Sequence, residues 1–276
     1  MTPLCQREGA SCGACCGLYN RRDHSRPALE ALLDRRTGEL AGAERTQAGF
    51  AAAAARLRAA GGEEPLFPSV RVCPLLGWLD EGRTRIGCLA HPLAAGGRDL
   101  RDAGEYDAAT CQAFLCPSHA WLAEEEAEMV RALCAGDPWL YGLVVTDVPF
   151  VRAVLGAVAD RCGARVEPRH LAAAPFRRAL RGLLALKEEL EPGSDGLYGA
   201  FRPGSDGEPV PRAIDYPALG RPRSPHDAIL LCVGADPRSG NDLDALEEEV
   251  RARLHACAAA FPAAPSGSGA GPHPPG

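Results

Sequence analysis

The cysteine-rich N-terminal segment constrains this chain more than any other feature of its sequence. Four thiols lie in the run Cys5-Gln-Arg-Glu-Gly-Ala-Ser-Cys12-Gly-Ala-Cys15-Cys16. Cys12 and Cys15 have the Cys-x-x-Cys spacing of structural metal sites, and nearby glycines let the backbone turn tightly around one point. The adjacent pair Cys15 and Cys16 is unusual, because neighbouring side chains diverge and one small tetrahedral ion rarely takes both. This pair therefore indicates a metal cluster or two neighbouring ions.

The chain has 12 cysteines among its 276 residues, and they fall into two classes by position. The candidate metal ligands precede residue 117 and are Cys5, Cys12, Cys15, Cys16, Cys73, Cys88, Cys111 and Cys116. The others are scattered singly through apolar segments, and we interpret them as core packing, since free cysteine is among the most buried residue types; they are Cys134, Cys162, Cys232 and Cys257.

Seven or eight sulfurs exceed the needs of one tetrahedral ion. Two four-thiolate sites, one cluster plus one ion, or one site with spare thiols all fit this number, and thiolates suit both zinc and iron–sulfur clusters. The histidines His24, His91 and His119 lie near the cysteines in sequence, and each is a candidate substitute for one of them.

Charge and hydropathy limit the partners and the compartment that we expect for the protein. The formal net charge of −6 gives no basic footprint for nucleic acid. The N-terminus lacks the pattern of a signal peptide, and no apolar run approaches the ~18 residues needed to span a membrane. We therefore expect a cytoplasmic protein whose partner is a metal ion or cluster, with no nucleic acid and no membrane. Because disulfides rarely persist in the cytoplasm, metal binding or catalysis is the better explanation for so many thiols.

The periodic segments predict a mainly α-helical fold with an irregular, metal-stapled N-terminal half. Helices at 27–36 and 43–60 form a helical hairpin between two cysteine-rich segments that lack apolar periodicity. Asp80-Glu81-Gly82 predicts the turn of a β-hairpin that brings Cys73 and Cys88 together. Metal binding would supply the folding free energy that these irregular segments need.

The C-terminal half has conventional helical patterns and a small β element. Helices are expected at residues 119–134, after Asp137-Pro138, after Asp147, after Pro175 and at residues 242–261 with a cap near Asn241 or Asp242. A hairpin or ordered loop is expected around residues 197–202, between two Gly-Ser-Asp-Gly turns, and a buried strand at 228–233.

Three domains follow from these patterns. Residues 1–117 are interpreted as a cysteine-cluster metal-binding domain and residues 118–261 as a helical domain with the small β element. Residues 262–276 are rich in Pro, Gly and Ser and are expected to be a disordered tail.

The cysteine motifs of residues 5–116 resemble those of a known family. They are Cys12-Gly-Ala-Cys15-Cys16, Cys73-Pro-Leu-Leu, Gly87-Cys88-Leu-Ala-His-Pro and Cys111-Gln-Ala-Phe-Leu-Cys116. In this order they resemble the CxxCxxCC cysteine-cluster proteins, which are described as zinc- or iron-chelating domains. The chain departs from the family pattern at its first cysteine, which would fall at Gly9 where this chain offers Cys5. The family's tyrosine and arginine in the third motif are Ala90 and His91 here.

The resemblance implies a cysteine-cluster protein that binds zinc, iron or an iron–sulfur cluster, with its specific activity open. A flagellin lysine methylase carries the same cluster, so a metal- or cluster-dependent group-transfer enzyme such as a protein lysine methylase is the leading alternative. The sequence has no serine–histidine pairing, phosphate loop or zinc-protease motif, and it indicates no catalytic residue. A thiol or metal redox sensor is a third interpretation, because exposed thiols of low pKa oxidise selectively.

Overall fold

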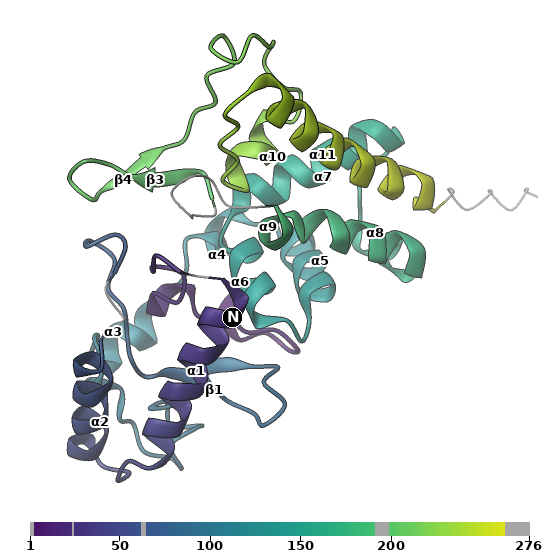
Figure 1. The fold of residues 1–276 in the computed structure, drawn as a ribbon. Coiled ribbons are helices and arrows are strands. Elements are labelled where there is room, and N and C mark those ends of the chain that lie inside the picture. Colours follow the sequence, from purple (N-terminus) through teal and green to yellow (C-terminus); the bar gives the residue numbers. More distant parts are fainter. Residues whose placement is uncertain (1–2, 24, 62–64, 191–198, 263–276) are drawn as a thin grey trace, which may run out of the picture.

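The structure is a computed structural model that describes residues 3–23, 25–61, 65–190 and 199–262. As predicted, the fold is mainly α-helical, with two small antiparallel two-stranded sheets. Figure 1 shows α1, α2, α3 and the first sheet at one end of the molecule, and α7, α8, α10 and α11 at the other, with α4, α5 and α6 between them. Within the described residues no single helix has the length and hydropathy to cross a membrane, and α6 with α7 passes only as a pair bent by 88°.

The N-terminal half contains the helical pair and the β-hairpin that the sequence predicted. The helices are α1 (Arg26–Ala41) and α2 (Gln47–Ala59), and the Gly49 N–H donates to the Thr46 side chain at the start of α2. The hairpin pairs β1 (Leu76–Trp78) with β2 (Ile86–Cys88) and places Leu76 opposite Cys88. The Asp80 carboxylate accepts the backbone N–H groups of Thr84 and Arg85, which closes the turn. The prediction of this hairpin is confirmed.

The first cysteine segment is packed against distant parts of the chain. It forms two 3₁₀ turns, η1 (Leu4–Gln6) and η2 (Ala14–Cys16). Leu4 and Leu18 are buried, and the Tyr19 hydroxyl donates to the carbonyl of Trp139 at 2.8 Å. Lack of periodicity therefore did not mean lack of burial: the segment gains stability from contacts that its local sequence does not reveal. That a bound metal stabilises the N-terminal half stays a prediction.

The C-terminal half begins with a correction to the predicted helix at 119–134. Two helices occupy it, α4 (Ser118–Trp121) and α5 (Glu124–Cys134). The backbone is extended at Leu122 and Ala123, and the Ala123 N–H donates to the Glu126 carboxylate, which starts the second helix afresh. Periodicity carried over the break because Leu122, at the end of α4, is buried in the same core as the apolar residues of α5.

Two aspartates begin the next helices as the sequence predicted. In α6 (Pro138–Val145) the Leu140 N–H donates to Asp137, and in α7 (Val148–Cys162) the Phe150 N–H donates to Asp147. Gly163 ends α7 in the left-handed conformation, at φ 65°.

The remaining helices include a second correction. The segment predicted as a strand at 228–233 is helix α10 (Asp227–Cys232), which packs on α7. A short apolar run does not distinguish a buried strand from a buried helical turn, and packing decided for the helix. Helix α11 (Gly240–Ala260) is capped by Ser239, two residues before the predicted Asn241. The other elements are η3 (Arg101–Ala103), α3 (Ala108–Ala113), η4 (Pro168–Ala172), α8 (Ala174–Leu184) and α9 (Leu186–Glu189).

The second sheet is a hairpin, but it lies later in the sequence than the expected element at 197–202 between the two Gly-Ser-Asp-Gly turns. It pairs β3 (Phe201–Pro203) with β4 (Pro209–Pro211), and the Gly-Ser-Asp-Gly sequence at 204–207 lies in its turn. The other such sequence, at 193–196, and the predicted tail after residue 262 lie outside the described residues.

Two hydrophobic cores hold the elements in place. The larger core joins N-terminal residues such as Leu18, Leu29 and Ile86 to α5, α6, α7, α8, α10 and α11. The smaller core lies between α2 and the β1–β2 hairpin and includes Phe50, Leu75 and the thiol of Cys73. The larger core draws on both sides of residue 117, and the division into domains stays a prediction.

Candidate metal centre

The fold sorts the eight candidate ligands into two neighbouring sets of four thiols. The first set is defined by interactions of Cys116 with the others and consists of Cys5, Cys12, Cys15 and Cys116. The second set is defined by interactions of Cys16 with the others and consists of Cys16, Cys73, Cys88 and Cys111. Cys16 also interacts with Cys12, so the two sets adjoin. Residues far apart in the sequence thus share one region, although their role as ligands stays a prediction.

The two adjacent cysteines, Cys15 and Cys16, both lie in the turn η2. The thiol of Cys15 interacts mainly with that of Cys116, and also with Cys12 and Cys16. The thiol of Cys16 interacts with those of Cys73, Cys88 and Cys111, and also with Cys12. Gly17 closes the turn in the left-handed conformation at φ 76°, and a Cβ there would lie 2.5 Å from the carbonyl oxygen of Arg71. Only glycine combines this conformation with so close an approach of two backbones. The two adjacent thiols therefore have different main neighbours, one in each set.

Backbone hydrogen bonds position the first set. The Cys12 N–H donates to the Cys5 carbonyl at 3.1 Å, and the Ala14 N–H donates to the Cys12 sulfur at 3.4 Å. Cys116 lies just before α4, and its carbonyl accepts the His119 N–H at 2.8 Å. The loop of Cys12 and the start of α4 therefore hold these sulfurs near one another.

His119 contributes a further nitrogen beside the first set. Its Nε2 is buried and has no hydrogen-bond partner among the described residues, and the imidazole interacts electrostatically with Cys116. A buried polar atom without a partner is uncommon and needs an explanation. A metal ion held by the first set would supply one, since imidazole nitrogen is an ordinary zinc or iron ligand.

The β-hairpin and its flanks position the second set. The Cys73 N–H donates to the Cys16 carbonyl at 3.0 Å, which fastens η2 to the strand entry. Cys88 ends β2, and its carbonyl accepts the backbone N–H of His91 at 3.1 Å. Cys111 lies on the short helix α3, which begins where the Thr110 N–H donates to Asp107.

Burial controls the protonation of most of these thiols. Burial raises the pKa of Cys12 to about 12, although the Ala14 N–H opposes it. Burial, followed by the neighbouring sulfurs Cys73, Cys88 and Cys111, raises the pKa of Cys16 well above its ordinary value. Cys116 is the exception: interaction with Cys15 lowers the pKa of its thiol. Without a cation the thiols whose pKa is raised hold their protons, whereas a bound metal would deprotonate them outright.

The candidate thiols lie in one region of the structure but do not surround a common point. Within the described residues, no three His, Cys, Asp or Glu side chains have an arrangement that could hold a metal ion. Protonated thiols have no charge that would draw them to a common centre, so closure requires rotation of the side chains together with loss of their protons. The donor set itself fits zinc or iron: soft sulfurs in fours, with one unpartnered imidazole nitrogen nearby.

Arg101 is a residue of this region that sequence reasoning missed. Its side chain is 9% exposed, bonds the Asp99 carboxylate at 2.8 and 2.6 Å, and interacts with Cys111 and Cys88. A four-thiolate zinc site carries a net negative charge, which a buried guanidinium would offset. No motif marked this arginine, because it lies in the stretch between Pro92 and Cys111 where the chain has no counterpart in the family pattern.

The remaining sequence candidates are placed as follows. The His91 Nδ1 accepts the Leu93 N–H, and His24 lies outside the described residues. Of the four cysteines interpreted as packing, three are buried in the larger core and Cys162 packs at its edge. That interpretation of their surroundings is confirmed.

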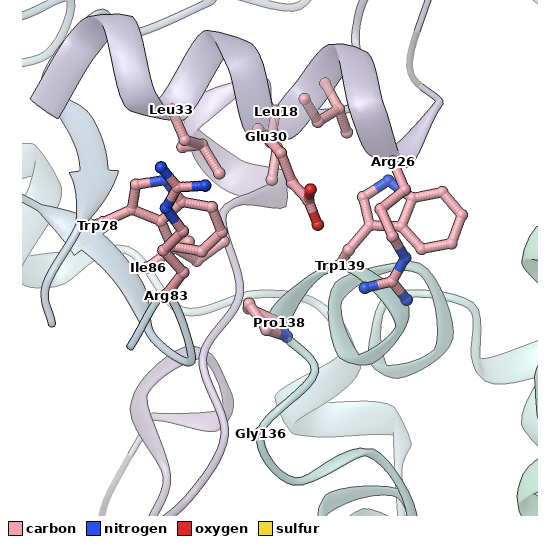
Figure 2. Close-up of a pocket in the computed structure, with 11 residues that line it drawn as sticks. Leu18, Arg26, Glu30, Leu33, Trp78, Arg83, Ile86, Gly136, Pro138 and Trp139 are labelled. Atoms are coloured by element: carbon pink, nitrogen blue, oxygen red, sulfur yellow. The ribbon is translucent and has the colours of Figure 1, made fainter. Parts of the chain in front are cut away.

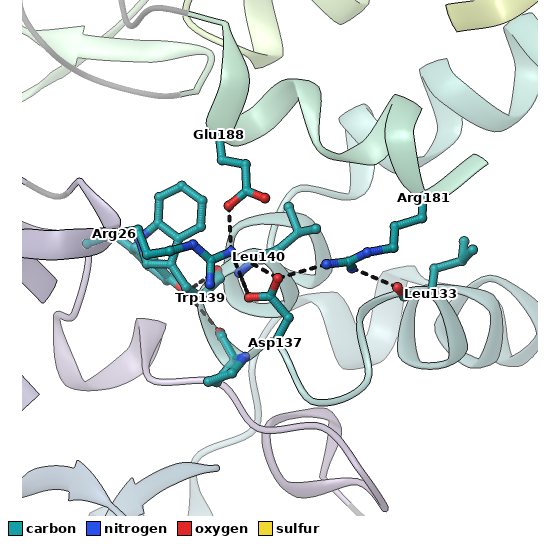
Figure 3. Close-up of polar contacts among 9 residues, drawn as sticks. Arg26, Leu133, Asp137, Trp139, Leu140, Arg181 and Glu188 are labelled. Carbon is teal, nitrogen blue, oxygen red and sulfur yellow. Dashed lines mark hydrogen bonds and ion pairs between the residues drawn. The ribbon is translucent and has the colours of Figure 1, made fainter. Parts of the chain in front are cut away.

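Two further features, a cavity and a network of ion pairs, connect the N-terminal half to the C-terminal helices, and neither includes a candidate ligand. A small cavity of about 50 Å³ lies between α1, the hairpin and α6. Figure 2 shows side chains that line it, among them Glu30, Trp78 and Trp139. In Figure 3, Arg26 bonds both oxygens of Asp137 at 3.0 and 2.9 Å and Glu188 at 2.6 Å. This network fastens α1 to α6 and α9, and neither feature is lined by a candidate thiol.

Comparison with known proteins gives no match: no family model, no curated protein and no solved structure is similar to the chain. The candidate function therefore depends on the arrangement of the thiols.

Proposed function

We propose that this chain is a cysteine-cluster metal-binding protein that holds zinc or iron at two four-thiolate sites. The first set would form one site, with His119 available as a substitute ligand, and the second set would form the other. An iron–sulfur cluster at either site is the iron form of the same proposal, because both metals prefer thiolate donors. We place the protein in a reducing compartment such as the cytoplasm, where thiols persist.

The observation that carries the proposal is the separation of Cys15 from Cys16. Of the alternatives that the sequence left open, two four-thiolate sites use every one of the eight sulfurs and need no spare thiol. Each set also draws on segments before and after α1 and α2, so a metal at either set would cross-link the chain. Bound zinc would supply folding free energy, whereas an iron–sulfur cluster would add one-electron chemistry.

Charge around the sites supports the same conclusion. Arg101 interacts with Cys111 and Cys88 of the second set, and the Ala14 N–H donates to the sulfur of Cys12 in the first. Hydrogen bonds to ligand sulfurs and nearby charge are the means by which proteins hold thiolate sites and tune them. The group-transfer enzyme remains an alternative without a supporting observation of its own, since the cavity of Figure 2 is not lined by a candidate thiol.

The test is metal stoichiometry in matched single-cysteine variants. Protein purified without oxygen should contain two metal equivalents, or one ion and one cluster, by elemental analysis and ultraviolet–visible spectroscopy. Cys12→Ser should lose the metal of the first set and Cys88→Ser the metal of the second. Cys162→Ser is the control, because this thiol lies at the end of α7, at the edge of the larger core, and the substitution should leave the metal content unchanged.

Two measurements keep the test decisive if a variant fails to fold. X-ray absorption at the metal edge of the wild-type protein counts sulfur and nitrogen ligands directly, and it also decides whether His119 binds. Titration of the reduced wild-type protein with cobalt gives thiolate charge-transfer bands for each occupied site. Metal content that is unchanged in both Cys12→Ser and Cys88→Ser, or oxygen-only coordination in the wild type, would contradict the proposal.

A further inference from the structure

We propose that the cavity between α1, the β1–β2 hairpin and α6 is a binding site for a quaternary ammonium group. Its lining combines two indole rings with one carboxylate that has no cation of its own. Aromatic faces beside a negative charge are the means by which proteins recognise such cations. The site is separate from the candidate thiols and does not depend on the proposed metal binding.

Glu30 supplies the carboxylate of the cavity. It lies on α1 and is half-buried, and in Figure 2 its carboxylate points into the space between Trp78 and Trp139. Among the described residues this carboxylate forms no hydrogen bond and no ion pair. A partly buried charge is less well solvated than one in open water, so a cation that enters the cavity would be attracted to it.

The two arginines that line the cavity already have carboxylate partners. Arg26 bonds Asp137 at 3.0 and 2.9 Å and Glu188 at 2.6 Å. Arg83 pairs with Asp34 at 3.0 Å. These two guanidinium groups therefore meet three carboxylates outside the cavity, and neither is left to neutralise the carboxylate inside it.

Two of the three tryptophans of the chain line the cavity. Trp78 ends β1, and its Nε1–H donates to the Asp34 carboxylate at 2.9 Å, which holds the indole in place. Trp139 lies in the first turn of α6, and the guanidinium carbon of Arg26 lies 4.9 Å from the centre of its ring. The face of an indole attracts a cation that lies within about 6 Å of the ring centre. A cation beside Glu30 would thus meet aromatic rings as well as a carboxylate.

The lining favours a cation that has no N–H groups. Glu30 is the one hydrogen-bond acceptor among the described side chains of the lining, and the apolar ones belong to Leu18, Leu29, Leu33, Ile86 and Pro138. A primary ammonium group has three donors, and a buried donor without a partner is unfavourable. A quaternary ammonium group has no donor, and its methyl groups can pack against the apolar side chains.

The size of the cavity fits the same group. Its volume of about 50 Å³ has room for about four water-sized groups, which is the size of a trimethylammonium head. A larger ligand would place only this head inside. The head could belong to a free solute such as choline or to a trimethylated lysine side chain, and the shared chemistry is the trimethylammonium group.

Titration of the wild-type protein with choline tests the proposal, with tryptophan fluorescence as the readout. Choline should give a saturable change that sodium chloride at the same ionic strength does not give. Two comparison ligands should bind about tenfold more weakly: ethanolamine, which has a primary ammonium group, and the uncharged analogue of choline in which a tert-butyl group replaces the trimethylammonium head. The Trp121→Phe variant should show the same change, because Trp121 is 62% exposed and does not line the cavity.

A second arm identifies the source of the cation. Acetylated trimethyl-lysine amide is titrated under the same conditions as choline. Tighter binding of the lysine derivative would assign the site to a protein side chain, and tighter binding of choline would assign it to a free solute.

Matched substitutions on α1 test the role of the carboxylate. Glu30→Gln keeps the size of the side chain and removes its charge, and it should weaken choline binding about tenfold. Glu39→Gln is the control, because Glu39 lies on the same helix, pairs with Arg56 and does not line the cavity. The proposal is overturned if choline gives no saturable change, if ethanolamine or the uncharged analogue binds as tightly, or if Glu30→Gln binds choline as the wild type does. The comparison of ligands uses the wild-type chain, so it remains decisive if a variant fails to fold.

Discussion

Lys187 is the only lysine of the chain, and its burial makes a quantitative prediction possible. Its side chain is 3% exposed, and its Nζ donates to the Asp147 carboxylate at 2.6 Å and to the carbonyl of Cys232. The ammonium also lies 4.9 Å from the centre of the Phe150 ring. Through these contacts one cation joins α9 to the start of α7 and the end of α10.

The substitution Lys187→Met keeps the length of the side chain and removes its charge. It leaves the Asp147 carboxylate, which is only 17% exposed, without its ion partner. Removal of one partner of a buried pair costs ~3–5 kcal/mol. Because the Phe150 N–H still donates to Asp147, we expect the low end, about 3 kcal/mol. That is a large part of the ~5–15 kcal/mol that separates folded from unfolded domains.

Removing both charges should restore most of this stability. In the double variant Asp147→Asn with Lys187→Met, asparagine still accepts the Phe150 N–H as a helix cap, and no unpaired charge remains buried. We expect the free energy of unfolding of the double variant to lie within about 1 kcal/mol of the wild-type value.

Urea unfolding followed by far-ultraviolet circular dichroism measures these free energies. The control is Arg251→Met: Arg251 pairs with Glu248 on the surface, where the two side chains are 47% and 65% exposed, and such pairs contribute less than about 1 kcal/mol. The reasoning from burial is wrong if the free energy of unfolding of Lys187→Met lies within about 1 kcal/mol of the wild-type value. It is also wrong if the double variant is no more stable than Lys187→Met alone.

Three further predictions follow from other contacts. Asp137→Asn should destabilise the protein by about 2 kcal/mol at neutral pH, since it weakens the hydrogen bonds from Arg26 and Arg181. Burial acts to raise the pKa of Asp137, but these hydrogen bonds outweigh it and lower the pKa, so the difference between variant and wild type in urea unfolding should shrink as the pH falls below about 4. Gly142→Ala should place a Cβ 2.0 Å from the Tyr19 hydroxyl and speed proteolysis of the N-terminal segment, with a cost of about 1–3 kcal/mol that exceeds the helix propensity gained. Acidification should release bound metal, because the ligand thiols must be deprotonated; metal retained in a dialysis series down to pH 4 would contradict thiolate ligation.

Local sequence signals predicted much of the secondary structure. Asp137 and Asp147 each cap the helix that follows because the cap needs only a carboxylate and the N–H group three residues on. The turn at Asp80 and the hairpin around it were likewise readable, since turn and strands lie within a few residues of one another. The vicinal cysteines indicated from sequence alone that one ion would not take both thiols.

Tertiary packing decided the rest. Helix α10 and the break at Leu122 depend on how short apolar runs meet the larger core, which a local pattern does not contain. The sorting of eight thiols into two sets, and the place of Arg101 beside one of them, depend on which distant segments meet at η2. The sequence by itself determined which residue types are present and how each short segment bends, because those effects act over a few residues. Only the packed chain determined which thiols are neighbours, because the distance between two thiols depends on how every element between them in the sequence is folded.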